Sequence, residues 1–182
     1  MKIIKGRFKH YSLVVPKNIR PAYFRLRKAL FDLLGEEILG KRVLDLFSGS
    51  GALGIEAFSC GAKEIYFVDF KKVCIRAIEI NLSYLKLLPF SHIVLKDAFK
   101  AIKDFYIRGE KFDIIFIDPP YYKGMGKKSL QTIDEYDILS FCGYIVVLAN
   151  FKEDFANNYK NFKLLIRKNY GQSAILIYRK NE

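Results

Sequence analysis

Strand-like and helix-like patterns of apolar residues alternate along this chain after residue 40. Short continuous apolar runs predict buried strands that end near Phe47, Asp69, Asp97, Asp118 and Ala149. The segments between these runs repeat apolar residues at the spacing of an amphipathic helix. Alternation of this kind predicts an α/β fold, in which helices cover both faces of a mostly parallel sheet.

The two ends of the chain follow other patterns. Residues 1–18 alternate enough to predict a short hairpin, and an apolar face over Leu26–Leu34 predicts one helix. After Ala149 we expect a short helix and then two strands, over Phe162–Arg167 and Ala174–Tyr178. These strands are too close in the sequence to hold a crossover helix, so we predict that they are antiparallel.

A glycine-rich loop directly follows the first predicted strand. Gly49, Gly51 and Gly54 have G-x-G-x-x-G spacing between a strand and a helical pattern, which is the context of a dinucleotide-binding loop. Asp45 stands four residues ahead of the first glycine, where its charge would repel a pyrophosphate. The same carboxylate suits a ligand that carries an ammonium and a sulfonium but no phosphate. The loop therefore favours S-adenosylmethionine over NAD or FAD.

Two further acidic residues end the next two predicted strands. Asp69 lies 18 residues past Gly51, where a carboxylate meets the ribose hydroxyls of an adenosine cofactor. Asp97 could accept a hydrogen bond from the adenine amino group. Each acid alone is more often a solvated strand end or a helix cap. Three acids at successive strand ends favour a cofactor site, because open α/β sheets bind ligands at that edge.

The fourth predicted strand runs into a corner with the sequence Asp118-Pro119-Pro120-Tyr121. Proline fixes its own φ and restricts the residue before it, so this corner is stiff. The Asp118 carboxylate and the Pro119 carbonyl can each accept one N–H of a planar amino group, which turns the nitrogen lone pair toward an electrophile. Tyr121 offers a flat face for a base outside its helix. The corner predicts methylation of an exocyclic amine; the alternative is a plain strand-to-loop corner with an N-capping Asp.

The formal charge of +12 is concentrated at the start of the 182-residue chain. Residues 1–28 hold five Lys and four Arg without an acidic residue, so they supply +9 of the +12. Aromatic residues such as Phe8 and Tyr11 are interleaved with these cations, which is typical of a segment that neutralises phosphates and stacks bases. A solvated basic surface is the alternative.

Other features of the composition limit the possible classes of protein. The three cysteines lack C-x-x-C spacing and fit a reducing cytoplasm, and the two histidines do not form a metal motif. The apolar runs are shorter than the roughly 20 residues that span a bilayer. No apolar segment follows the basic start as it would in a secretory signal. We therefore expect a cytoplasmic protein without a bound metal or a membrane partner.

Four motifs in order resemble those of the bacterial small-subunit (16S) ribosomal RNA guanine-N2 methyltransferases. They are the basic start, the D-L-F-x-G-S-G loop over Asp45–Gly51, the D-P-P-[FY] corner and the Y-G-x-[ST] sequence over Tyr170–Ser173. The chain departs from the family pattern in three places. Ala22–Phe24 replaces Thr-Thr-Asp, Lys28 stands where Glu is frequent, and the second strand ends in Asp rather than Glu.

The resemblance implies a Rossmann-like class I methyltransferase with a seven-stranded sheet, and S-adenosylmethionine as the cofactor. It divides the chain into a basic N-terminal extension (1–38, hairpin plus helix) and a methyltransferase domain (39–182). The residues implied for catalysis are Asp118, Pro119 and Tyr121. Those implied for cofactor binding are Asp45, Phe47, Gly49, Ser50, Gly51, Asp69, Phe70, Asp97 and Ala98. Those expected to contact RNA are Lys5, Arg7, Lys9, Arg20, Arg25, Arg27, Lys123 and Lys127.

The expected reaction is methyl transfer to the N2 amine of a guanine in small-subunit ribosomal RNA, either naked or within the assembled subunit, by a monomeric enzyme. Two alternatives within amine methylation stay open. An adenine-N6 enzyme could use the same corner, whereas a protein glutamine-N5 enzyme would normally carry Asn in place of Asp118. A third alternative is a catalytically silent RNA-binding module that has kept the fold. The glycines between residues 122 and 128 also predict a mobile loop that closes over the target base, although a plain turn fits them equally well.

Overall fold

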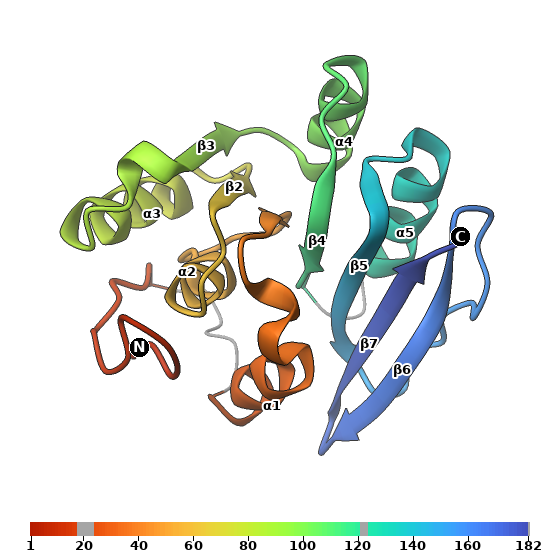
Figure 1. Cartoon of the computed structure of the whole chain (residues 1–182), viewed down its shortest axis with the longest axis horizontal. Helices are drawn as coiled ribbons and strands as arrows, with labels where there is room; N and C mark the ends of the chain where they lie inside the picture. Colours follow the sequence, from red (N-terminus) through yellow and green to blue (C-terminus); the bar gives the residue numbers. More distant parts are fainter. Residues whose placement is uncertain (18–23, 121–123, 182) are drawn as a thin grey trace.

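The computed structural model describes residues 1–17, 24–120 and 124–181. Seven strands form one sheet in the spatial order β3-β2-β1-β4-β5-β7-β6, and helices pack on both of its faces (Figure 1). The strands are β1 (Arg42–Asp45), β2 (Glu64–Asp69), β3 (Ser91–Leu95), β4 (Phe112–Ile117), β5 (Leu139–Asn150), β6 (Phe162–Tyr170) and β7 (Ser173–Lys180). The helices are α1 (Phe24–Leu34), η1 (Gly35–Ile38), α2 (Ala52–Ser59), α3 (Lys72–Tyr84), η2 (Leu88–Phe90), α4 (Ala98–Ile107) and α5 (Met125–Tyr136). Three residues of the predicted site, Arg20, Tyr121 and Lys123, lie outside the described residues.

The strand directions confirm the predicted α/β fold. Strands β1 to β5 are parallel, and β7 is antiparallel to both of its neighbours, β5 and β6. The predicted ends of β1 to β5 are correct to within two residues, with the largest differences at β1 and β3, which end at Asp45 and Leu95. Strand β6 continues three residues beyond its predicted end, to Tyr170. Because β1 to β4 are parallel neighbours, their carboxyl ends lie along one edge of the sheet.

The prediction of a short helix after Ala149 is wrong. Residues 151–161 form turns and irregular structure instead. The Asp134 carboxylate accepts the backbone N–H groups of Lys160 and Asn161 at 3.1 and 2.8 Å. The apolar pattern of this segment does not reveal a partner so distant in the sequence.

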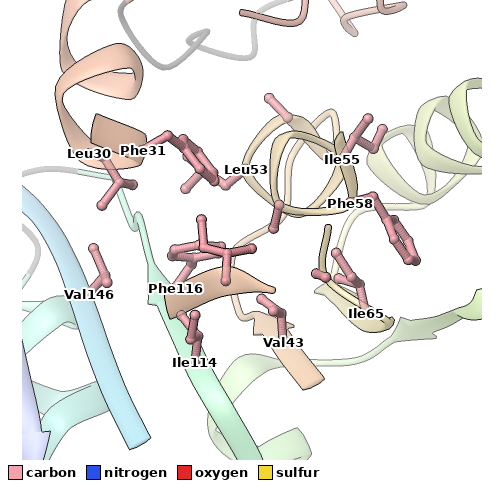
Figure 2. Packing of buried hydrophobic residues seen from close by; sticks show 14 of the residues in the cluster. Leu30, Phe31, Val43, Leu53, Ile55, Phe58, Ile65, Ile114, Phe116 and Val146 are labelled. Carbon is pink, nitrogen blue, oxygen red and sulfur yellow. The ribbon is translucent and has the colours of Figure 1, made fainter. Parts of the chain in front are cut away.

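The core consists of two apolar clusters, one on each face of the sheet. Val43, Ile114 and Phe116 point to the face that α1 and α2 cover (Figure 2). The neighbouring residues Leu44 and Ile115 point to the other face, toward α4 and α5. Successive residues of a strand alternate between faces, so two buried faces require the continuous apolar runs seen in the sequence.

The N-terminal segment packs into the first of these clusters. Its predicted hairpin is reduced to one isolated bridge, between Lys2 and Ser12. Ile3 and Leu13 are nonetheless buried in the same cluster as the sheet residues and as Leu30 of α1. The expected boundary near residue 38 therefore crosses a continuous hydrophobic core.

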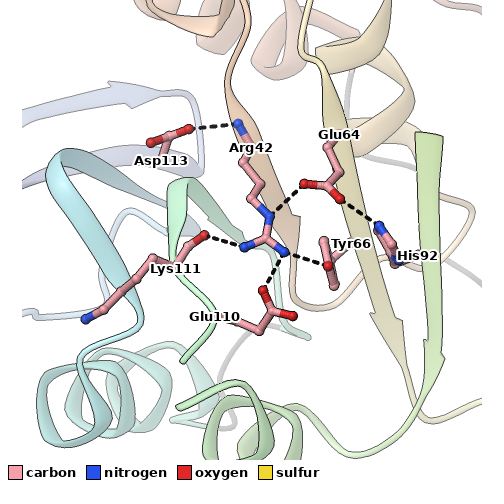
Figure 3. A network of polar contacts seen from close by, with 7 residues as sticks. All are labelled: Arg42, Glu64, Tyr66, His92, Glu110, Lys111 and Asp113. Carbon is pink, nitrogen blue, oxygen red and sulfur yellow. Dashed lines mark hydrogen bonds and ion pairs between the residues drawn. The ribbon is translucent and has the colours of Figure 1, made fainter. Parts of the chain in front are cut away.

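A polar network joins the amino ends of the strands, opposite the edge that carries the acids. The Arg42 guanidinium donates to the Glu64 carboxylate at 2.7 Å, to the Tyr66 hydroxyl at 2.6 Å and to the Glu110 carboxylate (Figure 3). Glu64 also contacts His92 across the sheet at 2.8 Å. Positive and negative groups are thus paired with one another at this end of the sheet.

Candidate cofactor and substrate site

Three carboxylates gather at the carboxyl ends of adjacent strands. Asp45 ends β1, Asp69 ends β2 on one side of it, and Asp118 follows β4 on the other. Asp45 is 1% exposed, while Asp69 and Asp118 are half-buried. The strand order of the fold therefore brings together residues that are far apart in the sequence.

The environment of Asp45 disfavours its negative charge. Burial, and to a smaller extent the nearby carboxylates of Asp118 and Asp69, raise the pKa of Asp45 to about 7. The backbone N–H of Gly54 donates to the Asp45 carboxylate at 3.0 Å and opposes this shift. A cation bound beside Asp45 would favour the ionised form, because it would offset both the burial and the repulsion.

Hydrogen bonds hold the glycine loop against the ends of β1 and β2. The two Asp69 oxygens accept the backbone N–H groups of Gly49 and Lys71, at 2.9 and 2.8 Å. The Ser48 hydroxyl donates to the Asp45 carbonyl at 2.6 Å. These contacts tie the loop to the ends of both strands.

Position 51 requires a glycine because of both its backbone conformation and its surroundings. Its φ of 78° lies in the left-handed region, and a Cβ there would stand 3.1 Å from a side-chain carbon of Ile78. Gly51 is also the N-cap position of α2, the helix that leads away from the loop. The loop thus brings backbone close to the carboxylates, as a bound cofactor would need.

The residues at this edge fit S-adenosylmethionine. Its ammonium and sulfonium would offset the negative charge at Asp45, and it has no phosphate for the carboxylates to repel. Asp69 stands at the strand end where the ribose hydroxyls of an adenosine cofactor are held in folds of this kind. The structure thus brings Asp45, Asp69 and the glycine loop together at one place, as the sequence predicted.

The structure places the third predicted cofactor acid at the start of a helix. Asp97 is the N-cap of α4, where its Oδ1 accepts the backbone N–H groups of Phe99 and Lys100, both at 3.1 Å. Its neighbour Ala98 is buried, and the ring of Phe47 packs edge-on against that of Phe99 at 6.5 Å. The helix-cap alternative therefore describes Asp97 in this structure, and an adenine contact stays a prediction.

Phe70 is the most exposed of the predicted cofactor residues. Its side chain is 63% exposed directly after Asp69, and the Lys71 ammonium lies 5.5 Å from the centre of its ring. An exposed aromatic ring at a ligand-binding edge can cover the flat face of a bound base. Ser50, another of the predicted cofactor residues, is buried within the glycine loop.

The corner after β4 is only partly described, because Tyr121 lies outside the described residues. Pro119 is buried and Asp118 is half-buried, and Asp118 lies close enough to Asp45 to raise its pKa. The prediction of a loop over residues 122–128 is wrong for its second half. Helix α5 begins at Met125, after Gly124 in the left-handed region, and includes Lys127. Its buried face, which includes Leu130 and Ile133, fixes this helical start.

The basic residues predicted to contact RNA divide into two groups. Arg7, Lys9, Arg25 and Lys127 are exposed, whereas Lys5 is partly buried and pairs with an acidic residue of α1, at 2.6 Å. The prediction for Arg27 is wrong in this structure, because its side chain is buried. It donates to the Lys2 carbonyl at 2.7 Å and faces Glu56 of α2 at 3.9 Å, and so ties three segments together.

Asn81 of α3 connects the N-terminal segment to the glycine loop, and the sequence analysis missed it. Its amide nitrogen donates to the carbonyls of Ser50 and Val14, both at 3.0 Å, and its oxygen accepts the Val14 N–H at 2.8 Å. Asn81 lies on the buried face of α3 together with Ile78 and Leu82. A polar residue on an apolar helical stripe was the signal that could have identified it.

The fold and this site define a class I methyltransferase, a class of enzymes that use S-adenosylmethionine as the cofactor. The family model described as "Conserved hypothetical protein 95" matches residues 1–179, and the chain belongs to this family, which includes ribosomal RNA small subunit methyltransferase D.

Relatives of the chain match it over almost its whole length. YlbH of Bacillus subtilis, a candidate rRNA methyltransferase, is 34% identical over 99% of this chain and 99% of its own. Ribosomal RNA small subunit methyltransferase D of Escherichia coli K12 is 28% identical over 99% of this chain and 90% of its own. The solved structure of the Escherichia coli protein yhhF, a candidate methyltransferase, superposes with a TM-score of 0.84 at 27% identity, over 100% of this chain and 98% of that one.

The described residues lack the features of a metal site and of a membrane span. No group of His, Cys, Asp or Glu side chains in the described part of the chain is placed to hold a metal ion. Within the same residues, no helix is both long and apolar enough to cross a bilayer.

Proposed function

We propose that this protein transfers a methyl group from S-adenosylmethionine to the exocyclic N2 amine of a guanine in small-subunit (16S) ribosomal RNA. The observation that carries the proposal is the position of Asp118, beside Asp45 and Asp69 at the cofactor edge of the sheet. Membership of a family that includes ribosomal RNA small subunit methyltransferase D supports the RNA substrate.

Each residue of the site has a distinct task in this reaction. S-adenosylmethionine, when bound, supplies a methyl group on a positively charged sulfur that departs neutral, so no general acid is required. Asp45 faces the cationic part of the cofactor, and Asp69 faces its ribose hydroxyls. The glycine loop brings backbone close to the cofactor because Gly51 has no side chain.

Asp118 and Pro119 act on the nucleophile. The guanine amine is weak, since its lone pair is conjugated with the ring, so the site must hold it in line with the methyl group. The carboxylate and the carbonyl each accept one of its N–H donors. Asp118 also stabilises the positive charge that grows on nitrogen during transfer, and the proton leaves afterwards.

Histidine has no role in the proposed mechanism. His92 lies at the opposite end of the sheet, where it contacts Glu64, and His10 lies in the N-terminal segment. Positioning and charge stabilisation therefore supply the rate enhancement in place of general base catalysis.

The RNA partner is proposed from the exposed basic residues. Arg7, Lys9, Arg25 and Lys127 can each approach a phosphate, and together they would make binding strongly dependent on salt. We propose that the protein acts as a monomer on naked RNA or on the assembled subunit.

The corner alone does not choose between guanine N2 and adenine N6, because both present a planar NH₂. The test is to incubate small-subunit RNA, and the assembled subunit, from cells that lack the enzyme with protein and S-adenosylmethionine. The RNA is then digested to nucleosides and analysed by mass spectrometry. N2-methylguanosine is the expected product. N6-methyladenosine would overturn the base assignment, and cofactor binding without any methyl transfer would favour a silent RNA-binding module.

A further inference from the structure

Four side chains form a continuous strip that crosses from the N-terminal segment to α3. The Arg7 guanidinium lies 5.4 Å from the centre of the Phe8 ring, which packs edge-on against Tyr11 at 6.2 Å. The Tyr11 ring lies 5.9 Å from that of Tyr84, the last residue of α3. We call these four residues the aromatic strip. Tyr11 is 46% exposed and Tyr84 is 67% exposed, so two of its rings offer open faces to solvent.

The N-terminal part of the strip is held rigidly on the protein. The Arg7 N–H donates to the Ser59 carbonyl at 2.8 Å, and the Phe8 N–H donates to the Ser59 hydroxyl at 2.9 Å. Gly6 permits this close approach, since a Cβ at that position would lie 1.7 Å from the Ser59 carbonyl oxygen. A rigid platform loses little conformational entropy when a partner binds to it.

The segment that carries the strip is joined to the cofactor loop. Asn81, one turn before Tyr84 on α3, bonds both to Val14 of the N-terminal segment and to Ser50 of the cofactor loop. A single buried side chain therefore links this segment to the loop proposed to hold the cofactor.

Charge identifies the kind of partner that suits these rings. The first 28 residues carry nine cations and no acid. Arg7 of the strip and the nearby Lys9 are both exposed. The ring of Tyr106, which is 53% exposed, packs against Tyr136 on the other face of the sheet, and the Lys103 ammonium lies 5.2 Å from the Tyr136 ring. This pair lies outside the N-terminal segment, in which nine cations occur without an acid. Exposed rings within such a dense group of cations can stack unpaired bases while the cations contact the phosphates.

We propose that the aromatic strip is a stacking platform for unpaired nucleotides of the substrate RNA, with Tyr11 and Tyr84 as the stacking residues. This inference rests on the proposed function, because it assigns a binding path to the same RNA. Stacking makes this surface sensitive to whether the RNA is single-stranded, which phosphate contacts alone would not do.

The test uses a feature of the composition, since the chain contains no tryptophan. Tyr84→Trp places a single fluorescent reporter on the strip, and Tyr106→Trp places the matched control on the other face. A short single-stranded RNA of mixed sequence should quench the fluorescence of the first variant and leave that of the second unchanged. Heparin, a polyanion without bases, should bind without quenching either variant. Equal quenching by heparin, or RNA binding without quenching at position 84, would overturn the proposal.

Affinity measurements separate stacking from charge. Tyr84→Ala should weaken binding of the same RNA by roughly tenfold with an unchanged salt slope, whereas Tyr84→Phe should bind normally. Arg7→Gln should instead reduce the salt slope by about one. Tyr106→Ala is the control for loss of an exposed ring, and thermal melting checks that each variant is folded. Normal affinity in Tyr84→Ala would contradict the platform, while failure of the wild-type protein to bind RNA would contradict the proposed function as well.

Discussion

The two ends of the central sheet differ in the charges that act on their acidic residues. At the amino ends, Arg42 lies between Glu64 and Glu110, and its guanidinium pairs with both carboxylates (Figure 3). At the carboxyl ends, Asp118 and Asp69 lie near Asp45 and raise its pKa. One end holds a cation between its acids, and the other carries repulsion that a cationic ligand can relieve.

The shifts in pKa express the same difference. Burial alone would raise the pKa of Glu64, but hydrogen bonds from His92 and Arg42 bring it below its usual value. In contrast, burial and two like charges raise the pKa of Asp45 to about 7. Local pairing that stabilises a fold lowers the pKa of an acid, whereas a site prepared for a cation raises it until the ligand arrives.

The largest expected effect concerns the reaction itself. Asp118→Ala should lower turnover by about 10²–10³-fold, because a carboxylate that faces developing charge contributes mainly to the transition state. Cofactor binding, measured by calorimetric titration, should persist. Gly51→Val is the contrasting variant and should lose cofactor binding, whereas Gly109→Ala, at a left-handed glycine in open space, controls for backbone strain alone. Equal loss of binding in Asp118→Ala and Gly51→Val would contradict the role proposed for Asp118.

A smaller effect should appear in the dependence of cofactor binding on pH. Since cofactor binding favours ionised Asp45, affinity should fall by up to about tenfold per pH unit as pH drops below 7. The unliganded protein should behave in the opposite way. The folded pKa lies above the unfolded value of roughly 3.9, so Asp45 makes folding less favourable as pH rises from about 4 to 7. Calorimetry and chemical denaturation at several pH values measure the two trends. Asp45→Asn should flatten both, and an unchanged pH dependence in this variant would assign the titration to another group.

The smallest effect on function should come from a substitution at the amino ends of the strands. Arg42→Met should lower the free energy of unfolding by roughly 2–3 kcal/mol, because it leaves the hydrogen-bonding oxygens of Glu64 and Glu110 without their donor. Thermal melting measures this loss, and calorimetry on the folded variant should give unchanged cofactor affinity. Weaker cofactor binding in this variant would mean that the two ends of the sheet are coupled, and would contradict the expectation that the Arg42 network does not affect the cofactor site.

Much of the fold was predictable because its signals are local. Apolar runs marked the strands, and each predicted acid lies at or within two residues of the end of its strand. The glycine spacing likewise located the loop between β1 and α2. Parallel topology then places such residues along one edge, so much of the candidate site followed from the order of its motifs.

The errors involve partners that are distant in the sequence. Arg27 looked like part of a basic surface, but it is buried against Glu56, and nothing in the local pattern of either residue reveals the other. Asp134 likewise accepts backbone N–H groups of a distant segment in which local spacing allowed a helix and the structure has none. The two links of Asn81 depend on how three segments meet in space.

The position of β7 has a consequence for how the protein is made. This strand is synthesised after both of its neighbours, yet it lies between β5 and β6 and pairs with each over its length. Until residues 173–180 leave the ribosome, the nascent chain keeps open strand edges that could pair with other chains. Folding of this half of the sheet therefore has to wait until residues 173–180 are synthesised, and chains released before that point would be targets for aggregation and proteolysis.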